Sequence, residues 1–185
     1  MYLTRPVLSL LLIPALLCVS GCGYQFRADG EPVGIEIKSI AIPMVESSSS
    51  EKGFEADFTS VLRNEFISHA RVQLKNKDQA DMILQIEIYE VSTQPLTYNS
   101  TRTAVSGRVV THETTSSRRL ILRLNTSLID SSNGKAVWND SEMTEEARFA
   151  VTADPLVNRK NRKEALLKIA RLLSERIYNR TMERF

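Results

Sequence analysis

Two stretches of alternating side chains constrain the fold of this chain more than any other feature. In each, an apolar residue recurs at every second position: Met82, Leu84, Ile86 and Ile88 in 81–91, and Leu120, Leu122, Leu124 and Leu128 in 120–130. A period of two residues is that of a β-strand, whose successive side chains point to opposite faces. Both segments therefore predict strands in a sheet with one apolar face and one polar face.

An earlier apolar stretch, 33–45, predicts a strand with an interruption. Val33, Ile35 and Ile37 alternate in one phase, and Ile40, Ile42 and Met44 alternate in the other. The change of phase at Lys38-Ser39 indicates a bulge or a break between two short strands. Pro43 has no N–H to donate, so it places the end of this strand at an edge of the sheet or outside it.

A hairpin is predicted after the strand at 120–130. Asn133-Gly134 favours a type I′ turn, because both residues tolerate positive φ. The next strand covers roughly 135–139 and includes Trp138, the only tryptophan. Pairing can resume beyond it as far as Phe149.

Helical periodicity predicts two helices. The first, about 54–70, places Phe54, Phe58, Leu62 and Phe66 on one face. The serines at 47–50 could cap its start, or form a flexible polar loop. The second, about 156–182, follows Asp154-Pro155, a cap residue and a proline suited to the first helical position. Its apolar stripe includes Leu166, Ile169, Leu173 and Ile177.

The expected order is strand, helix, strand, strand, strand, helix. Each helix has one apolar stripe to bury, and the sheet offers one apolar face. We therefore expect an α+β fold, a two-layer α/β sandwich with a mixed or antiparallel sheet of about four strands and two helices on one face.

Residues 92–117, between two predicted strands, have an unusual composition. Twelve of the 26 are Ser or Thr. A loop of this length in a compact domain is usually functional or disordered. Alternatively, both strands extend into the segment as a polar hairpin, and the sequence leaves the two interpretations open.

The N-terminal region has the features of an export signal. Arg5 precedes an apolar run, 7–19, that is too short for a membrane span and contains Pro14. Val19-Ser20-Gly21-Cys22 follows and resembles the bacterial lipobox. An ordinary signal peptide with a chance cysteine is the alternative. We expect a signal peptide at 1–21, a lipidated N-terminus and leader at 22–34, and a single domain at 35–185.

Lipidation defines the cofactor and compartment predictions. Cys22 would carry a diacylglycerol and an N-acyl chain, and no other cofactor is expected. Acyl chains anchor a protein at the membrane without spanning it. By resemblance to bacterial lipoproteins, Gly23 rather than Asp after the cysteine favours the outer membrane. Cys18 is lost with the signal and Cys22 is blocked, so the mature domain can form no disulfide.

Charge and motif content argue against nucleic-acid binding and against catalysis. Removing 1–21 takes away one of the 24 basic residues, leaving 23 against 22 acidic ones, so no field steers the domain to nucleic acid. His69 and His112 lack metal-ligand spacing, and no catalytic motif is present. We expect a binding protein and not an enzyme.

Three features of the chain resemble the LptE family of lipopolysaccharide-assembly lipoproteins. They are the start of the mature chain, Cys22-Gly23-Tyr24-Gln25-Phe26, the strand at 37–42 and the element order. The resemblance implies an outer-membrane lipoprotein on the periplasmic side that sits inside the lumen of the LptD β-barrel. There it would act as plug and assembly factor and help to deliver lipopolysaccharide to the outer leaflet.

The resemblance also implies where lipopolysaccharide would bind. In the family, basic ligand-binding residues lie in the loop between the second and third strands and near the start of the last helix. The matching regions here offer Arg102, Arg108, Arg159 and Lys160. A basic cluster at a helix N-terminus conflicts with the helix dipole, which an anion would relieve. A solvated basic face is the alternative.

Two rival functions remain at this point. A periplasmic regulator or channel component, such as a peptidoglycan-synthase activator or a secretion-channel subunit, differs in its partner. A domain that binds a small ligand between helices and sheet would have a pocket lined by Phe54, Phe58 and Leu166.

Overall fold

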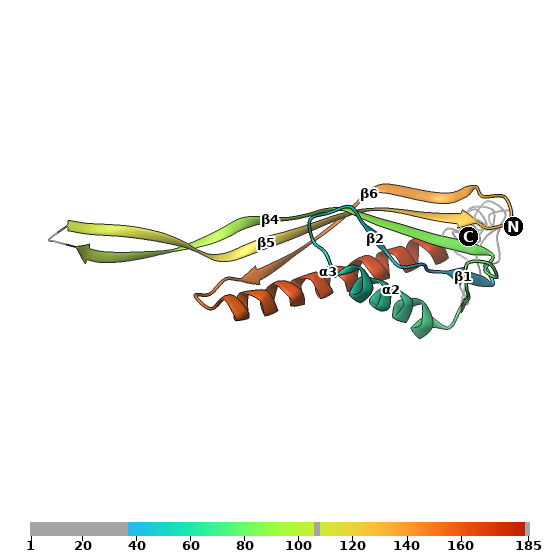
Figure 1. Ribbon diagram of the computed structural model, residues 1–185, viewed down its shortest axis with the longest axis horizontal. Helices are drawn as coiled ribbons and strands as arrows, with labels where there is room; N and C mark the ends of the chain where they lie inside the picture. Colours follow the sequence, from blue (N-terminus) through green and yellow to red (C-terminus); the bar gives the residue numbers. More distant parts are fainter. Residues whose placement is uncertain (1–36, 106–107, 184–185) are drawn as a thin grey trace, which may run out of the picture. The chain divides into compact units, whose positions relative to one another are not determined.

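The computed structural model describes residues 37–105 and 108–183, which form an α+β domain with both helices on one face of a mixed sheet (Figure 1). The predicted fold class is confirmed. The elements are β1 (Ser39–Ala41), β2 (Glu46–Ser47), α2 (Glu55–His69), β3 (Gln73–Leu74), β4 (Met82–Val105), β5 (Arg108–Asp130), β6 (Ala136–Ala150) and α3 (Pro155–Glu183).

The sheet has six strands where about four were expected. Its order is β3-β1-β4-β5-β6, and β2 also pairs with β4. The parallel pairs involve β1 and β2, whereas β4, β5 and β6 are successive antiparallel strands. The two unexpected strands, β2 and β3, have two residues each, too few for a periodic pattern to show.

The apolar face of the sheet and the stripes of both helices form one core, as the alternation predicted. Leu84 and Ile88 of β4 and Leu122 of β5 are 1% exposed or less. They belong to the same buried cluster as Phe58 of α2 and Leu173 of α3. Among the described residues, no helix is long and apolar enough to cross a membrane.

The first predicted strand needs correction. Met44, expected on the apolar side, is 64% exposed, whereas Val45 is buried and donates its N–H to Thr59 Oγ1 at 2.9 Å. Pro43 lies outside every strand, as expected, and ends the alternation. Residues 33–36 of this prediction, the signal and leader regions and the lipidation site Cys22 lie outside the described residues.

The hairpin between β5 and β6 is confirmed, but the type I′ turn is wrong. The loop has five residues, 131–135, and Gly134 has positive φ whereas Asn133 does not. The Asp130 carboxylate accepts hydrogen bonds from Ser132 and Asn133 at 2.7–2.8 Å, and the Gly134 N–H donates to Asp130 O. The hydrogen bonds from Ser132, its side chain first, and from Asn133 lower the pKa of the Asp130 carboxyl. Together with the Gly134 bond they hold the wider loop.

The helix starts differ from each other. Asp154 caps α3 as predicted, since its Oδ1 accepts the Leu156 N–H at 2.8 Å. At α2 the cap residue is Phe54, which makes no side-chain cap hydrogen bond. The serines at 47–50 therefore do not cap α2, and that interpretation is wrong.

The described residues of the segment 92–117 form the two paired strands of a polar hairpin. β4 and β5 pair up to Val105↔Arg108, so the hairpin alternative is confirmed over the functional or disordered loop. We call residues 97–105 of β4 with 108–116 of β5 the ribbon. Figure 1 shows that it continues past the part of the sheet that the helices cover.

Candidate functional site

The face of the sheet opposite the helices, here the open face, is polar as the alternation predicted. It carries two ion pairs between exposed or half-exposed side chains, Arg123–Glu90 at 3.1 Å and Arg119–Glu146 at 3.2 Å. An exposed pair contributes only about 0–1 kcal/mol to stability. This face is therefore suited to polar contacts with a partner.

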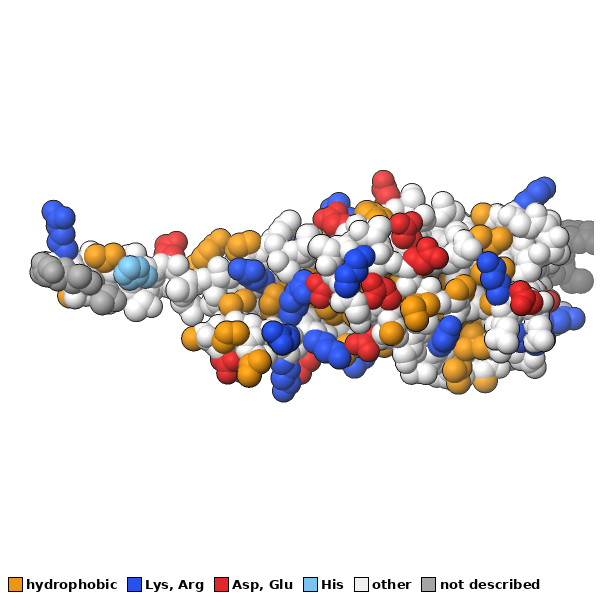
Figure 2. All heavy atoms as spheres, viewed as in Figure 1, with side chains coloured by type: hydrophobic (Ala, Val, Ile, Leu, Met, Phe, Trp, Pro, Cys, Tyr) orange, Lys and Arg blue, Asp and Glu red, His pale blue; other side chains and the backbone are white. Residues whose placement is uncertain are grey.

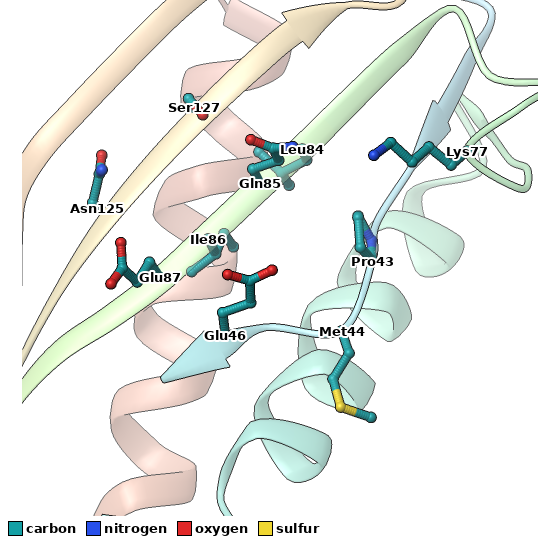
Figure 3. Close-up of a pocket in the computed structure, with 10 residues that line it drawn as sticks. All are labelled: Pro43, Met44, Glu46, Lys77, Leu84, Gln85, Ile86, Glu87, Asn125 and Ser127. Atoms are coloured by element: carbon teal, nitrogen blue, oxygen red, sulfur yellow. The ribbon is translucent and has the colours of Figure 1, made fainter. Parts of the chain in front are cut away.

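A hollow of about 230 Å³ lies on the open face, between the segment joining β1 to β2 and strands β4 and β5 (Figure 3). Glu46 and Glu87 line it and are direct neighbours in the β2–β4 register. Lys77 and Asn125 also line it. The Asn125 amide oxygen is buried and has no hydrogen-bond partner among the described residues.

Size and lining limit what this hollow can hold. Pockets for drug-sized ligands span about 300–1,000 Å³ and are mostly apolar. This one is smaller and carries two carboxylates, an ammonium and amide groups. It suits a polar side chain or water, and it does not suit an acyl chain.

The structure places the two predicted ribbon arginines apart. Arg102 is opposite Thr111 in the β4–β5 register, and Arg108 is opposite Val105. The three-residue offset between 102 and 105 puts Arg102 and Arg108 on opposite faces of the ribbon. Both are exposed, so each is free to meet a ligand, but they do not form one site.

Arg159 and Lys160 lie near the start of α3, on the side that faces solvent. The basic cluster there is largely balanced within the protein: Lys160 pairs with Glu164 at 3.8 Å, Arg162 with Glu51 at 2.6 Å and Lys163 with Asp57 at 3.3 Å. Much of the conflict with the helix dipole is therefore relieved by carboxylates of the described chain.

Further arginines lie at the base of the ribbon and were not singled out from the sequence. Arg118, Arg119 and Arg148, here the basic band, sit on β5 and β6, and Arg119 is directly opposite Arg148. Arg119 Nε is buried without a hydrogen-bond partner among the described residues. The alternation of side chains along β5 places Arg119 on the open face. That Arg148 lies opposite it follows only from the register between β5 and β6. Figure 2 shows Lys and Arg gathered where the ribbon leaves the helices.

The histidines form no metal site in the part of the chain that the structure describes, which holds no group of three potential ligands. His69 Nε2 lies 3.1 Å from Glu65 Oε1, and its ring stacks on Tyr178 with centroids 4.1 Å apart. His112 is exposed on the ribbon.

The small-ligand interpretation required a pocket lined by Phe54, Phe58 and Leu166. All three side chains are at most 5% exposed and belong to the packed core. The hollow in Figure 3 lies on the other face of the sheet and is lined by different residues.

Comparison with known families identifies the family of the chain. The family model described as LptE, lipopolysaccharide-assembly, matches residues 37–181. The chain belongs to the LptE family. It is thus a lipoprotein of the LptE type, and the family resemblance noted in the sequence is confirmed.

Solved structures provide a more distant comparison. A minor lipoprotein from Acinetobacter baumannii is 15% identical, with a TM-score of 0.48, and the match covers 80% of this chain and 91% of that one. The rare lipoprotein B from Shewanella oneidensis is 12% identical, with a TM-score of 0.45, covering 78% and 93%. No curated protein matches the chain.

Proposed function

We propose that this protein is an outer-membrane lipoprotein, anchored through Cys22 on the periplasmic side, that plugs an LptD-type β-barrel and assists lipopolysaccharide assembly. Membership of the LptE family carries the proposal. Its role is binding and not catalysis.

The open face of the sheet supports the plug. The interior of a large outer-membrane barrel is polar and wet. A sheet face with exposed ion pairs and a polar ribbon can form hydrogen bonds in such a lumen without burying unpaired apolar surface. The two helices cover the apolar face of the sheet, so that face is not exposed to the lumen.

Crosslinking tests whether a barrel surrounds the domain. Tyr89 on β4 and Ile67 on α2 lie on different layers and are 38% and 59% exposed. Each is replaced singly by a photoreactive amino acid in cells. An enclosing barrel predicts that both positions give adducts with the same outer-membrane protein.

A regulator docked on a periplasmic enzyme gives a different result. In that case one layer faces the partner, and adducts form from only one position or with a soluble protein. The unsubstituted chain, illuminated in parallel, is the control for adducts that do not depend on the photoreactive group.

We propose further that Arg102, Arg108, Arg159 and Lys160 contribute to lipopolysaccharide binding. Arginine can bind phosphate through two hydrogen bonds, and lysine as a point charge. In the basic band, Arg119 and Arg148 face each other on the open face and Arg118 points to the other face, so a headgroup on either side of the sheet would meet added positive charge.

A charge reversal tests this assignment. The double variant Arg102→Glu, Lys160→Glu should weaken lipopolysaccharide binding by about tenfold, because two attractive charges become repulsive. The matched control is Lys75→Glu with Lys135→Glu, two exposed lysines beyond the other end of the long strands. Equal binding by both double variants in a purified-ligand assay would remove these residues from the site.

A further inference from the structure

The ribbon receives the least support from the rest of the described chain. Residues 108–114 of β5 are all exposed, and Figure 1 shows the ribbon running beyond both helices. A two-stranded hairpin alone is marginally stable in water and needs a third strand or a packed helix. Within the described residues the ribbon has neither, so added structure would stabilise it.

The β5 edge of the ribbon continues the edge along which β6 pairs with β5 in the body of the sheet. β6 pairs with β5 from Ile129 to Ser117, and the Val151 N–H donates to Ser116 O at 2.9 Å. The chain then turns into α3. The same edge of β5 therefore continues without a described partner over 108–115, about 26 Å at 3.3 Å per residue.

The opposite edge, on β4, is less regular. Pro95 lacks an N–H, and at two register shifts, between Ile88 and Glu90 and between Pro95 and Thr97, β4 has the extra residue; at the next shift, between Thr97 and Tyr98, the extra residue is Ser116 of β5. Proline and irregular register are devices that discourage strand addition. These interruptions lie within 88–97, so a strand that continued from β2 along the free edge of β4 toward the ribbon would meet them, whereas 98–105 of β4 contains none.

The β5 edge has none of these devices over 108–115, and this stretch begins directly beyond Ser116, where the pairing of β5 with the chain after β6 ends. Its register is regular from Tyr98↔Thr115 to Val105↔Arg108, and 108–115 contains no proline. Five of the eight residues are Val or Thr, which favour strands. One basic and one acidic side chain, Arg108 and Glu113, leave no run of like charge, and Figure 2 shows a mostly uncharged surface along the ribbon.

We propose that residues 108–115 of β5 bind an extended segment of the barrel partner as an additional β-strand, in line with β6. Main-chain hydrogen bonds would supply the contact, and the polar side chains of the ribbon would tolerate the wet lumen. The inference rests on the proposed function, since it takes the barrel as the source of the strand.

Hydrogen exchange followed by mass spectrometry tests the pairing on the full-length lipidated protein, alone and with its barrel. Half of the amides in 108–115 point away from β4 and should exchange rapidly in the protein alone. In the complex they should exchange at least about tenfold more slowly. Amides of 98–105 should change little.

Proline variants supply a second test with matched controls. His112 and Glu113 are consecutive, so one of the two directs its N–H to the free edge. The partners across the ribbon are Thr101 and Ser100. Of His112→Pro and Glu113→Pro, the variant that removes the N–H at the free edge should lower barrel recovery about tenfold. The controls Thr101→Pro and Ser100→Pro perturb the ribbon at the same two levels and should not lower recovery.

The outcomes separate this inference from the proposed function. If the barrel is recovered but protection is absent from 108–115, or appears on β4 instead, the inference is wrong and the plug stands. Protection that grows with protein concentration without the barrel would identify a second copy as the occupant and overturn the inference. If no barrel is recovered, the proposed function fails and takes the inference with it.

Discussion

At the scale of single residues, Tyr178 is the buried polar group whose position has the clearest consequence. It is 4% exposed, lies against Phe66 edge to face and against His69 in a stack, and its hydroxyl has no hydrogen-bond partner among the described residues. Burial raises the pKa of Tyr178 above the usual value, with opposing effects from Arg71 and Glu65. The neutral phenol is therefore favoured in the fold.

Tyr178→Phe should raise the free energy of unfolding by about 1 kcal/mol at neutral pH, because an unpaired buried hydroxyl is removed and the ring contacts are kept. The raised pKa has a second effect. Because the phenol ionises more readily in the unfolded chain, the contribution of Tyr178 to the free energy of unfolding is fully present below its unfolded pKa of about 10. That contribution is lost as pH rises through the higher folded pKa. The variant should lose less stability in that alkaline range.

Urea unfolding at neutral and alkaline pH measures both effects. Tyr98→Phe is the matched control, because Tyr98 is 57% exposed on the ribbon and should change neither value. A Tyr178→Phe protein that is less stable than the parent at neutral pH would show that the hydroxyl has a stabilising partner.

At the scale of elements, the sequence predicted what periodicity can encode. The long strands β4 and β5 and both helices follow from repeated apolar positions, and the α3 start follows from Asp154-Pro155. β2 and β3 could not be predicted, since two residues form no pattern and their pairing with β4 and β1 depends on distant parts of the chain.

The hairpin elements show a second limit. The sequence could not decide between a loop and a hairpin for the ribbon, because the segment is rich in Ser and Thr and has no alternating apolar residues to mark a strand. In the loop 131–135 the local Asn-Gly signal was overridden by the Asp130 carboxylate, which accepts hydrogen bonds from the two residues that follow Ser131. Local turn propensity does not include such side-chain contacts.

The candidate site was predictable only in part, for the same reason. Family resemblance pointed to the ribbon and to the start of α3, and single residues there could be named. Three arrangements depend on strand register or on tertiary contacts that local sequence does not encode. They are the opposite directions of Arg102 and Arg108, the position of Arg148 opposite Arg119, and the pairing of Arg162 with Glu51.

At the scale of the whole domain, the structure separates two roles. The helices and the apolar face of the sheet make a core that needs no partner to cover it. The open face, the basic band and the ribbon remain available for contacts. With this division the domain buries its own apolar surface and leaves polar surface for the partners of the proposed function.

The most direct test of this account is recovery of the partner. The lipidated, tagged protein is purified from outer membranes in mild detergent, and associated proteins are identified and quantified by mass spectrometry. We expect a large LptD-type β-barrel at a near-equal molar amount. Recovery of a periplasmic synthase, or of this chain alone, would contradict the plug and assign the domain to a regulator or a channel component.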